Sequence, residues 1–165
     1  MAHDGQYDLM IETPAMKDIL ALTQQAVKPL ETLNTKAINN LRELVTLDNK
    51  VSSSLIETHQ SAAHGVAWLA TYTESIRQMV KWGEKVSEQN KFGQTEQLLL
   101  QIAVSEYLGQ ILGGIMMSQG EIFRLNDIGL TTLDLSEFQT QAVKDLIQNG
   151  NSQHARALLV DIMLD

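Results

Sequence analysis

Histidines and carboxylates are the residues from which a catalytic or metal site would have to be built here, because the chain contains no cysteine. The four histidines are His3, His59, His64 and His154. His59 and His64 are five residues apart, whereas a metal-binding pair on a helix prefers a four-residue spacing. A di-iron helical bundle needs Glu-x-x-His pairs, and the sequence has none. We therefore expect no bound metal, and histidines that are solvated or lie at helix caps.

The carboxylates also lack a catalytic arrangement. Glu84 and Glu88 are one helical turn apart, but Lys81, Lys85 and Lys91 lie close to them in the sequence. Mixed charge at this spacing is typical of a solvated helix face. No glycine-rich phosphate-binding loop and no Gly-x-Ser-x-Gly nucleophile motif is present. We expect no catalytic residue and no cofactor bound by this chain alone.

One segment has a composition suited to contact with another molecule. It contains two adjacent glycines, two methionines, small polar residues and an arginine. Methionine adapts its shape to a partner, and arginine often anchors interfaces. The segment could therefore bind a protein surface or an acyl-type ligand, although simple closure of a loop explains the composition equally well. We call it the docking edge, and its residues are Gly113, Gly114, Met117, Ser118, Gln119, Glu121 and Arg124.

The elements that would position this edge are helices, because apolar residues recur at three- and four-residue spacing. Thr13 and Pro14 suit the N-cap and first position of a helix. Pro29 either kinks that helix or begins the next one. Beyond it, an apolar stripe repeats every seven residues, and packing within one bundle is favoured over a dimeric coiled coil. The residues of this heptad stripe are Leu30, Ala37, Leu44 and Val51, with Leu33 and Leu47 between them.

Two further long helices are predicted. Residues 54–57 fit a capping box, so a break near 49–54 is expected, with one continuous helix as the alternative. That second helix should end near Asn90, with Gly93 as its left-handed terminator. The third should run over about 95–113 and be stopped by the two glycines. Its inward-facing residues are predicted to be Leu98, Leu99, Ile102, Leu108, Ile111 and Leu112.

The remainder is expected to be shorter structure. Residues 116–132 have no clear period and are predicted to be an ordered loop. A short helix should be capped at 134–137, and Gly150 should close it before Ser152 caps a last helix over 153–164. The sequence therefore predicts an all-α fold. It is a bundle of three to four long helices plus two short C-terminal helices, in a single domain over residues 1–165.

Charge and hydropathy exclude several classes of partner. The 165 residues carry a net charge of −8 and no basic cluster. Binding to nucleic acid phosphates or to an anionic membrane would require such a cluster. The first five residues lack the features of a secretion signal, and the longest apolar runs are far shorter than a membrane span. We expect a cytoplasmic protein that binds neither nucleic acid nor membrane.

The segment 68–130 resembles a known family, above all in 70–79 (ATYTESIRQM), 91–93 (KFG) and 113–122 (GGIMMSQGEI). These strings are similar to the N-terminal helical extension of bacterial acyl-CoA dehydrogenases of the methylsuccinyl-CoA dehydrogenase type. The likeness is good over the last two-thirds of the chain and poor over the first 50 residues. It implies a non-catalytic accessory domain that packs on the dehydrogenase core or on a partner subunit. The alternative is a free-standing interaction module that dimerises through the heptad stripe.

The resemblance also bears on the cofactor. The family uses FAD and a glutamate base, and both are expected in a portion that follows Asp165 in a longer chain, which would stop here at a domain boundary. Phe92-Gly93 and the stretch 110–114 partly match motifs by which the family's own helical domain contacts the flavin. However, Gln89 stands where those motifs have an arginine, so a bidentate phosphate contact would be lost. FAD is therefore expected in the parent enzyme and not in this chain.

Overall fold

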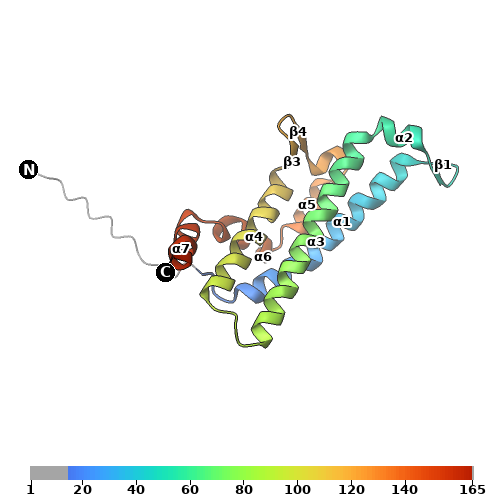
Figure 1. Ribbon diagram of the computed structural model, residues 1–165. Coiled ribbons are helices and arrows are strands. Elements are labelled where there is room, and N and C mark those ends of the chain that lie inside the picture. Colours follow the sequence, from blue (N-terminus) through green and yellow to red (C-terminus); the bar gives the residue numbers. More distant parts are fainter. Residues whose placement is uncertain (1–14, 165) are drawn as a thin grey trace, which may run out of the picture.

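The computed structural model describes residues 15–164, and three long helices form its framework (Figure 1). They are α1 (Ile19–Val45), α3 (Gln60–Glu88) and α4 (Gln94–Gly113). Each of the three contacts the other two, and the core between them is made of leucine, isoleucine, valine and alanine. The predicted all-α class is thus confirmed. Among residues 15–164, every helix is too short or too polar to cross a lipid bilayer.

Shorter elements complete the structure. Two small antiparallel hairpins, β1–β2 and β3–β4, lie at the ends of long helices. The C-terminal part contains more helical segments than the two that the sequence predicts. The elements are β1 (Thr46–Leu47), β2 (Lys50–Val51), α2 (Ser53–Thr58), β3 (Ile115–Ser118), β4 (Glu121–Phe123), η1 (Leu125–Ile128), α5 (Thr132–Phe138), α6 (Gln141–Asp145), the π-helical turn η2 (Leu146–Gly150) and α7 (Gln153–Leu164).

Helix α1 continues through Pro29, so this proline does not begin a new helix. The predicted cap at Thr13 and Pro14 lies outside the described residues. The heptad stripe is only partly a buried face. Its first members, Leu30, Leu33 and Ala37, are buried inside the bundle, as the intramolecular alternative predicts. Its last members, Leu44, Leu47 and Val51, are exposed, because the helix ends at Val45 and the chain turns into the β1–β2 hairpin.

The break between the first two long helices is confirmed, but its cap differs from the prediction. Asp48 and Asn49 adopt left-handed conformations in the two-residue turn between β1 and β2. Ser52 then caps α2, because its hydroxyl oxygen accepts a hydrogen bond from the backbone N–H of Leu55 at 3.4 Å. The capping box predicted at Ser54 is therefore wrong by two residues, and a continuous helix is excluded.

The connection between α3 and α4 corrects the role of Gly93. The left-handed residue after α3 is Asn90, with φ of 56°. Asparagine tolerates this conformation because its short polar side chain can bond locally. Gly93 has φ of −83° and is instead the N-cap of α4. Its backbone N–H donates to Oε2 of Glu96 at 2.9 Å.

Helix α4 buries only part of the face that was predicted, and Ile102 is half-buried. Leu98, Leu108 and Ile111 are buried as expected, but Leu99 and Leu112 are 39% and 36% exposed. Apolar residues are so dense in this helix that their periodicity does not define one stripe. The buried face includes two polar residues instead, Gln101 and Ser105.

The segment 116–132 is not the loop that the sequence predicts. It contains the β3–β4 hairpin and then the short 3-10 helix η1. In the hairpin, Ile115 pairs with Phe123 and Met116 pairs with Ile122. Each strand is so short that the alternation of buried and exposed residues covers only three or four positions. A period of two cannot be recognised in the sequence over such a length.

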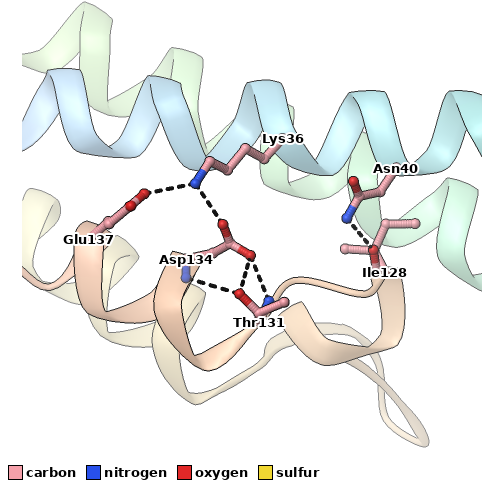
Figure 2. A network of polar contacts seen from close by, with 6 residues as sticks. All are labelled: Lys36, Asn40, Ile128, Thr131, Asp134 and Glu137. Atoms are coloured by element: carbon pink, nitrogen blue, oxygen red, sulfur yellow. Dashed lines mark hydrogen bonds and ion pairs between the residues drawn. The ribbon is translucent and has the colours of Figure 1, made fainter.

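Thr131, and not Asp134, caps α5, and Asp134 is the partner residue of the capping box. Figure 2 shows that Asp134 has a second role, because it joins α5 to α1. Nζ of Lys36 lies 2.6 Å from Oδ1 of Asp134 and 2.7 Å from Oε2 of Glu137. Asn40, one turn further along α1, donates to the carbonyl of Ile128 at 2.9 Å. These contacts hold the segment 128–137 against α1.

The Lys36 contact makes the stability of this attachment depend on pH. The hydrogen bond from Lys36, followed by those from Thr131, holds the pKa of Asp134 well below its ordinary value of 3.8. The ordinary value is the one that Asp134 has in the unfolded chain. The ionised carboxylate therefore contributes its full stabilisation at pH values well above 3.8, and this stabilisation is lost as the pH falls below that value. The pKa of Lys36 is raised by the same two carboxylates, so its contribution is lost only in strongly alkaline solution.

We expect the substitution Asp134→Asn to lower the melting temperature at pH 7, because the ion pair with Lys36 is removed. The difference from the wild type should shrink as the pH falls below about 3.8. Thermal unfolding followed by circular dichroism between about pH 2 and pH 8 measures this. Asp161→Asn on the exposed face of α7 is the matched control. A difference that stays constant with pH would contradict the assigned role.

The prediction that Ser152 caps a last helix over 153–164 is confirmed. The hydroxyl oxygen of Ser152 accepts from the backbone N–H of Ala155 at 3.1 Å, and α7 follows as expected. Gly150, just before it, is buried against Ser105 of α4. A Cβ at Gly150 would lie 1.8 Å from the Ser105 hydroxyl oxygen, so only glycine allows this approach.

Candidate interaction surface

The predicted docking edge is the β3–β4 hairpin together with the end of α4 that leads into it. Figure 1 shows the hairpin at one end of the bundle, beside the end of α3 that follows α2. Gly114 allows the turn out of α4, because its φ of 120° is accessible mainly to glycine. A Cβ there would also lie 2.7 Å from Cγ2 of Ile122. The sequence did not predict the two strands of this segment.

A close contact with α3 holds the hairpin in place. Phe123 lies directly on Gly65, where a Cβ would be only 2.0 Å from its ring. Phe123 and its cross-strand neighbour Ile115 are both buried. At the border of the hairpin, the Ser61 hydroxyl donates to Oε1 of Glu121 at 2.8 Å. One face of the hairpin is thus anchored to α3 by an aromatic ring and a hydrogen bond.

The opposite face of the hairpin carries the exposed apolar residues. Met116 and Ile122 are cross-strand neighbours and are 65% and 40% exposed. Sequence reasoning counted Met116 among the two methionines of this segment but did not include it or Ile122 in the docking edge, because strand pairing was not expected there. The alternation that buries Ile115 and Phe123 exposes their neighbours Met116 and Ile122, but it is too short to be recognised in the sequence. Met116 and Ile122 form the centre of what we call the outer face.

The predicted edge residues are distributed around this centre. Gly113, Ser118, Gln119 and Arg124 are exposed, and Gly114 and Glu121 are half-buried. Met117 is partly buried and packs against the core, so it supports the hairpin from below. The side chain of Arg124 passes over Gly114, with Cγ 3.6 Å from the position of a Cβ there.

A hollow of about 310 Å³ lies beside the hairpin, at the junction of α2 and α3. Its lining residues are Thr58, His59, Ser61, Ala62, Phe123 and Asp127. The hydroxyl of Thr58 donates to the carbonyl of Ser54 at 2.9 Å, and that of Ser61 donates to Glu121. Oδ2 of Asp127 accepts from the backbone N–H of Arg124 at 2.7 Å. The hydroxyl protons of Thr58 and Ser61 are therefore used within the protein, while the imidazole of His59 also lines the hollow.

The histidines do not come together in the part of the chain that the structure describes. His59 is half-buried at the junction of α2 and α3 and lines the hollow. His64 is exposed, and its Nε2 accepts from Nε1 of Trp68 at 3.0 Å. His154 is exposed on α7, and His3 lies outside the described residues. Within residues 15–164, no group of three or more His, Asp or Glu side chains is arranged to hold a metal ion.

The two partial flavin motifs do not fit a bound flavin. Phe92 and Gly93 precede α4, whereas Gln110 and Gly114 lie at its other end, about 25–30 Å away at the helical rise per residue. Phe92 packs against the core. Gln110 accepts from the hydroxyl of Tyr72 at 2.7 Å and donates to Glu106 at 2.7 Å. Its side chain is therefore already used within the bundle.

Comparison with known proteins supports the resemblance seen in the sequence. The chain is 47% identical over 156 residues to (2S)-methylsuccinyl-CoA dehydrogenase from Cereibacter sphaeroides. The match covers 94% of this chain, so it extends into the first 50 residues, where the likeness had been judged poor. It covers only 28% of the dehydrogenase, so the chain corresponds to a fragment of that protein. No protein-family model matches the chain.

Proposed function

We propose that this chain is a non-catalytic helical domain of an FAD-dependent acyl-CoA dehydrogenase, packing on the catalytic core or on a partner subunit of that enzyme. The observation that carries the proposal is the 47% identity over 94% of the chain to a protein of which it spans only 28%. In this proposal residues 1–165 are one N-terminal domain, and FAD and the catalytic residues belong to the larger remainder. The expected location is the cytoplasm.

Two features of the fold support a packing role over a catalytic one. Several polar side chains of the bundle bond to one another, as in the pairing of Lys36 with Asp134 and of Gln110 with Tyr72. The exposed apolar pair Met116 and Ile122 lies on a hairpin that is firmly seated on α3. An exposed apolar patch of this kind marks a contact surface more often than a reaction site.

The direct test is to isolate the native protein that carries this sequence and to assay it beside the 165-residue chain. We expect a polypeptide several times larger, which holds a yellow flavin and oxidises a branched acyl-CoA thioester with an artificial electron acceptor. The 165-residue chain should bind no flavin and oxidise no thioester. A native product limited to these 165 residues, with no dehydrogenase associated with it, would refute the proposal.

A further inference from the structure

We infer that an exposed apolar face of α7 is covered, in the full-length enzyme, by the segment of the same polypeptide that follows Asp165. That segment turns back after α7 and packs the apolar side of a helix against this face. The inference rests on the proposed function, in which residues 1–165 precede the dehydrogenase portion of one chain. It adds to that proposal the surface that is used and the part of the enzyme that covers it.

Helix α7 has little buried surface of its own. Among its 12 residues, Ala155 is the one that is buried. Its main neighbour is α4, and Figure 1 shows it at the outside of the bundle. A helix of this length is marginal in water by itself, because most helical stability in proteins comes from the packing of an apolar face. A further neighbour would therefore stabilise α7.

The exposed side of α7 is apolar over its last two turns. Ala157, Val160 and Leu164 are three and four residues apart, so they lie on one side of the helix. Met163 lies three residues after Val160 and widens this side. Val160, Met163 and Leu164 are 54%, 70% and 80% exposed. We call these four residues the α7 face, and a cluster of exposed apolar side chains of this kind marks a contact surface.

The position of the α7 face indicates which segment covers it. Gln153 and Arg156 lie on the same side in the first turn and are polar, so the apolar part is confined to the end of the helix that leads to Asp165. A segment that turns back directly after α7 meets these last turns first. The related dehydrogenase is much longer than this chain, which spans 28% of it, and in the proposed function that remainder supplies the segment.

The size of the α7 face favours a connected segment over a second molecule. A stable interface between separate proteins uses about 20–30 residues on each side, whereas the α7 face consists of four. A segment joined to α7 by a short connection needs less area, because the covalent link gives it a high effective concentration. Helices joined by short loops commonly pack as antiparallel neighbours.

Oxidation of Met163 in the full-length enzyme tests the inference without any substitution. Dilute peroxide converts an accessible methionine to its sulfoxide, and mass spectrometry of peptides measures the rate. We expect Met163 to react several-fold more slowly in the native enzyme than in the same enzyme unfolded in urea. In the 165-residue chain the reduction should be small, because the residue is 70% exposed there.

The outcomes separate this inference from the proposed function. If Met163 of a native full-length dehydrogenase reacts as fast as in the unfolded enzyme, the inference is wrong and the proposed function stands. The proposed function fails by a different result, which is a native product limited to these 165 residues.

A photo-reactive side chain in place of Val160 identifies the occupant. With p-benzoylphenylalanine at this position of the full-length enzyme, irradiation should join α7 to a peptide of the same chain. We expect that peptide within the first ~25 residues after Asp165, roughly the length of one connection and one helix. A cross-link to a more distant part of the dehydrogenase, or to a second copy of the enzyme, would overturn the inference.

The substitution Val160→Glu tests whether the contact is apolar. We expect Met163 to be oxidised several-fold faster in this variant of the full-length enzyme than in the wild type, because an unpaired carboxylate resists burial. The melting temperature of the 165-residue chain should hardly change, since Val160 is exposed there. Leu133→Glu, at a 67% exposed position of α5, is the matched control and should leave the oxidation of Met163 unchanged. Equal rates in the Val160 variant and the wild-type enzyme would contradict an apolar contact at this face.

Discussion

Replacing Gln101 with leucine is expected to lower the free energy of unfolding by about 2–4 kcal/mol, although leucine is apolar and of similar size. Gln101 is completely buried in α4. Its Oε1 accepts from the backbone N–H of Met16 at 2.7 Å, and its Nε2 donates to the carbonyl of Gly150 at 2.9 Å. The side chain thus joins two distant parts of the backbone to the central helix. Leucine would remove both hydrogen bonds, and the one to the carbonyl of Gly150 is buried away from water.

The measurement is urea unfolding of the 165-residue chain, with the free energy taken from the midpoint and the slope. Gln25→Leu, at an exposed position of α1, is the matched control and should change the stability by no more than about 0.5 kcal/mol. A loss at Gln101 no greater than that at Gln25 would show that the two hydrogen bonds are replaced by other contacts. The Gln101 variant should also speed amide exchange in the segment around Gly150.

Replacing Gly65 with alanine is expected to destabilise the chain by about 1–3 kcal/mol, towards the upper end of that range. The added Cβ would lie 2.0 Å from Cδ2 and 2.2 Å from Cγ of Phe123, and an aromatic ring cannot bend aside as a flexible side chain can. The ring must leave its seat, and the β3–β4 hairpin must move with it. The variant should therefore also disturb the outer face at Met116 and Ile122.

A double-mutant cycle shows whether this contact is the cause. Phe123→Ala alone should cost about 3–5 kcal/mol, because a buried ring is lost. Adding Gly65→Ala to that variant should then cost nothing further, since the clash is gone. Gly109→Ala, inside α4 with no atom within 4 Å of the added Cβ, is the control and should be neutral or slightly stabilising. A penalty at Gly65 that persists without Phe123 would contradict this explanation.

Two tertiary contacts bear on the proposed function, namely Phe123 on Gly65 and the ion pair of Lys36 with Asp134. A domain whose role is to present a surface needs that surface to be rigid, because mobile residues lose entropy when a partner orders them. Gly65 and Phe123 fix the hairpin on α3. The pairing of Lys36 with Asp134 fixes the segment 128–137 on α1, as Figure 2 shows. Both attachments are made by residues far apart in the sequence.

The positions of the heptad-stripe residues argue against the alternative in which the chain dimerises through that stripe. Leu30 and Ala37 were half of the proposed dimer stripe, and both are buried within the bundle. A second chain could reach them only if the bundle opened. Leu44 and Val51 are exposed but lie on different elements, a helix end and a hairpin. They do not continue one helical face.

The sequence by itself determined the features that depend on local periodicity and on short-range caps. Three long helices, the cap at Ser152 and the end of α4 at Gly114 were predicted correctly, because apolar spacing and glycine or serine positions act over a few residues. The family resemblance was also visible in the sequence, and comparison with the related dehydrogenase supports it.

The tertiary structure alone decided which residues these helices bury and how the hairpin forms. Gln101 interrupts an apolar run in the sequence, yet its hydrogen bonds to Met16 and Gly150 make it a core residue. Met116 and Ile122 become an exposed pair only because Gly65 leaves room for Phe123 beneath them. Burial of a polar group or pairing of two short strands depends on partners far along the chain, and no local pattern encodes those partners.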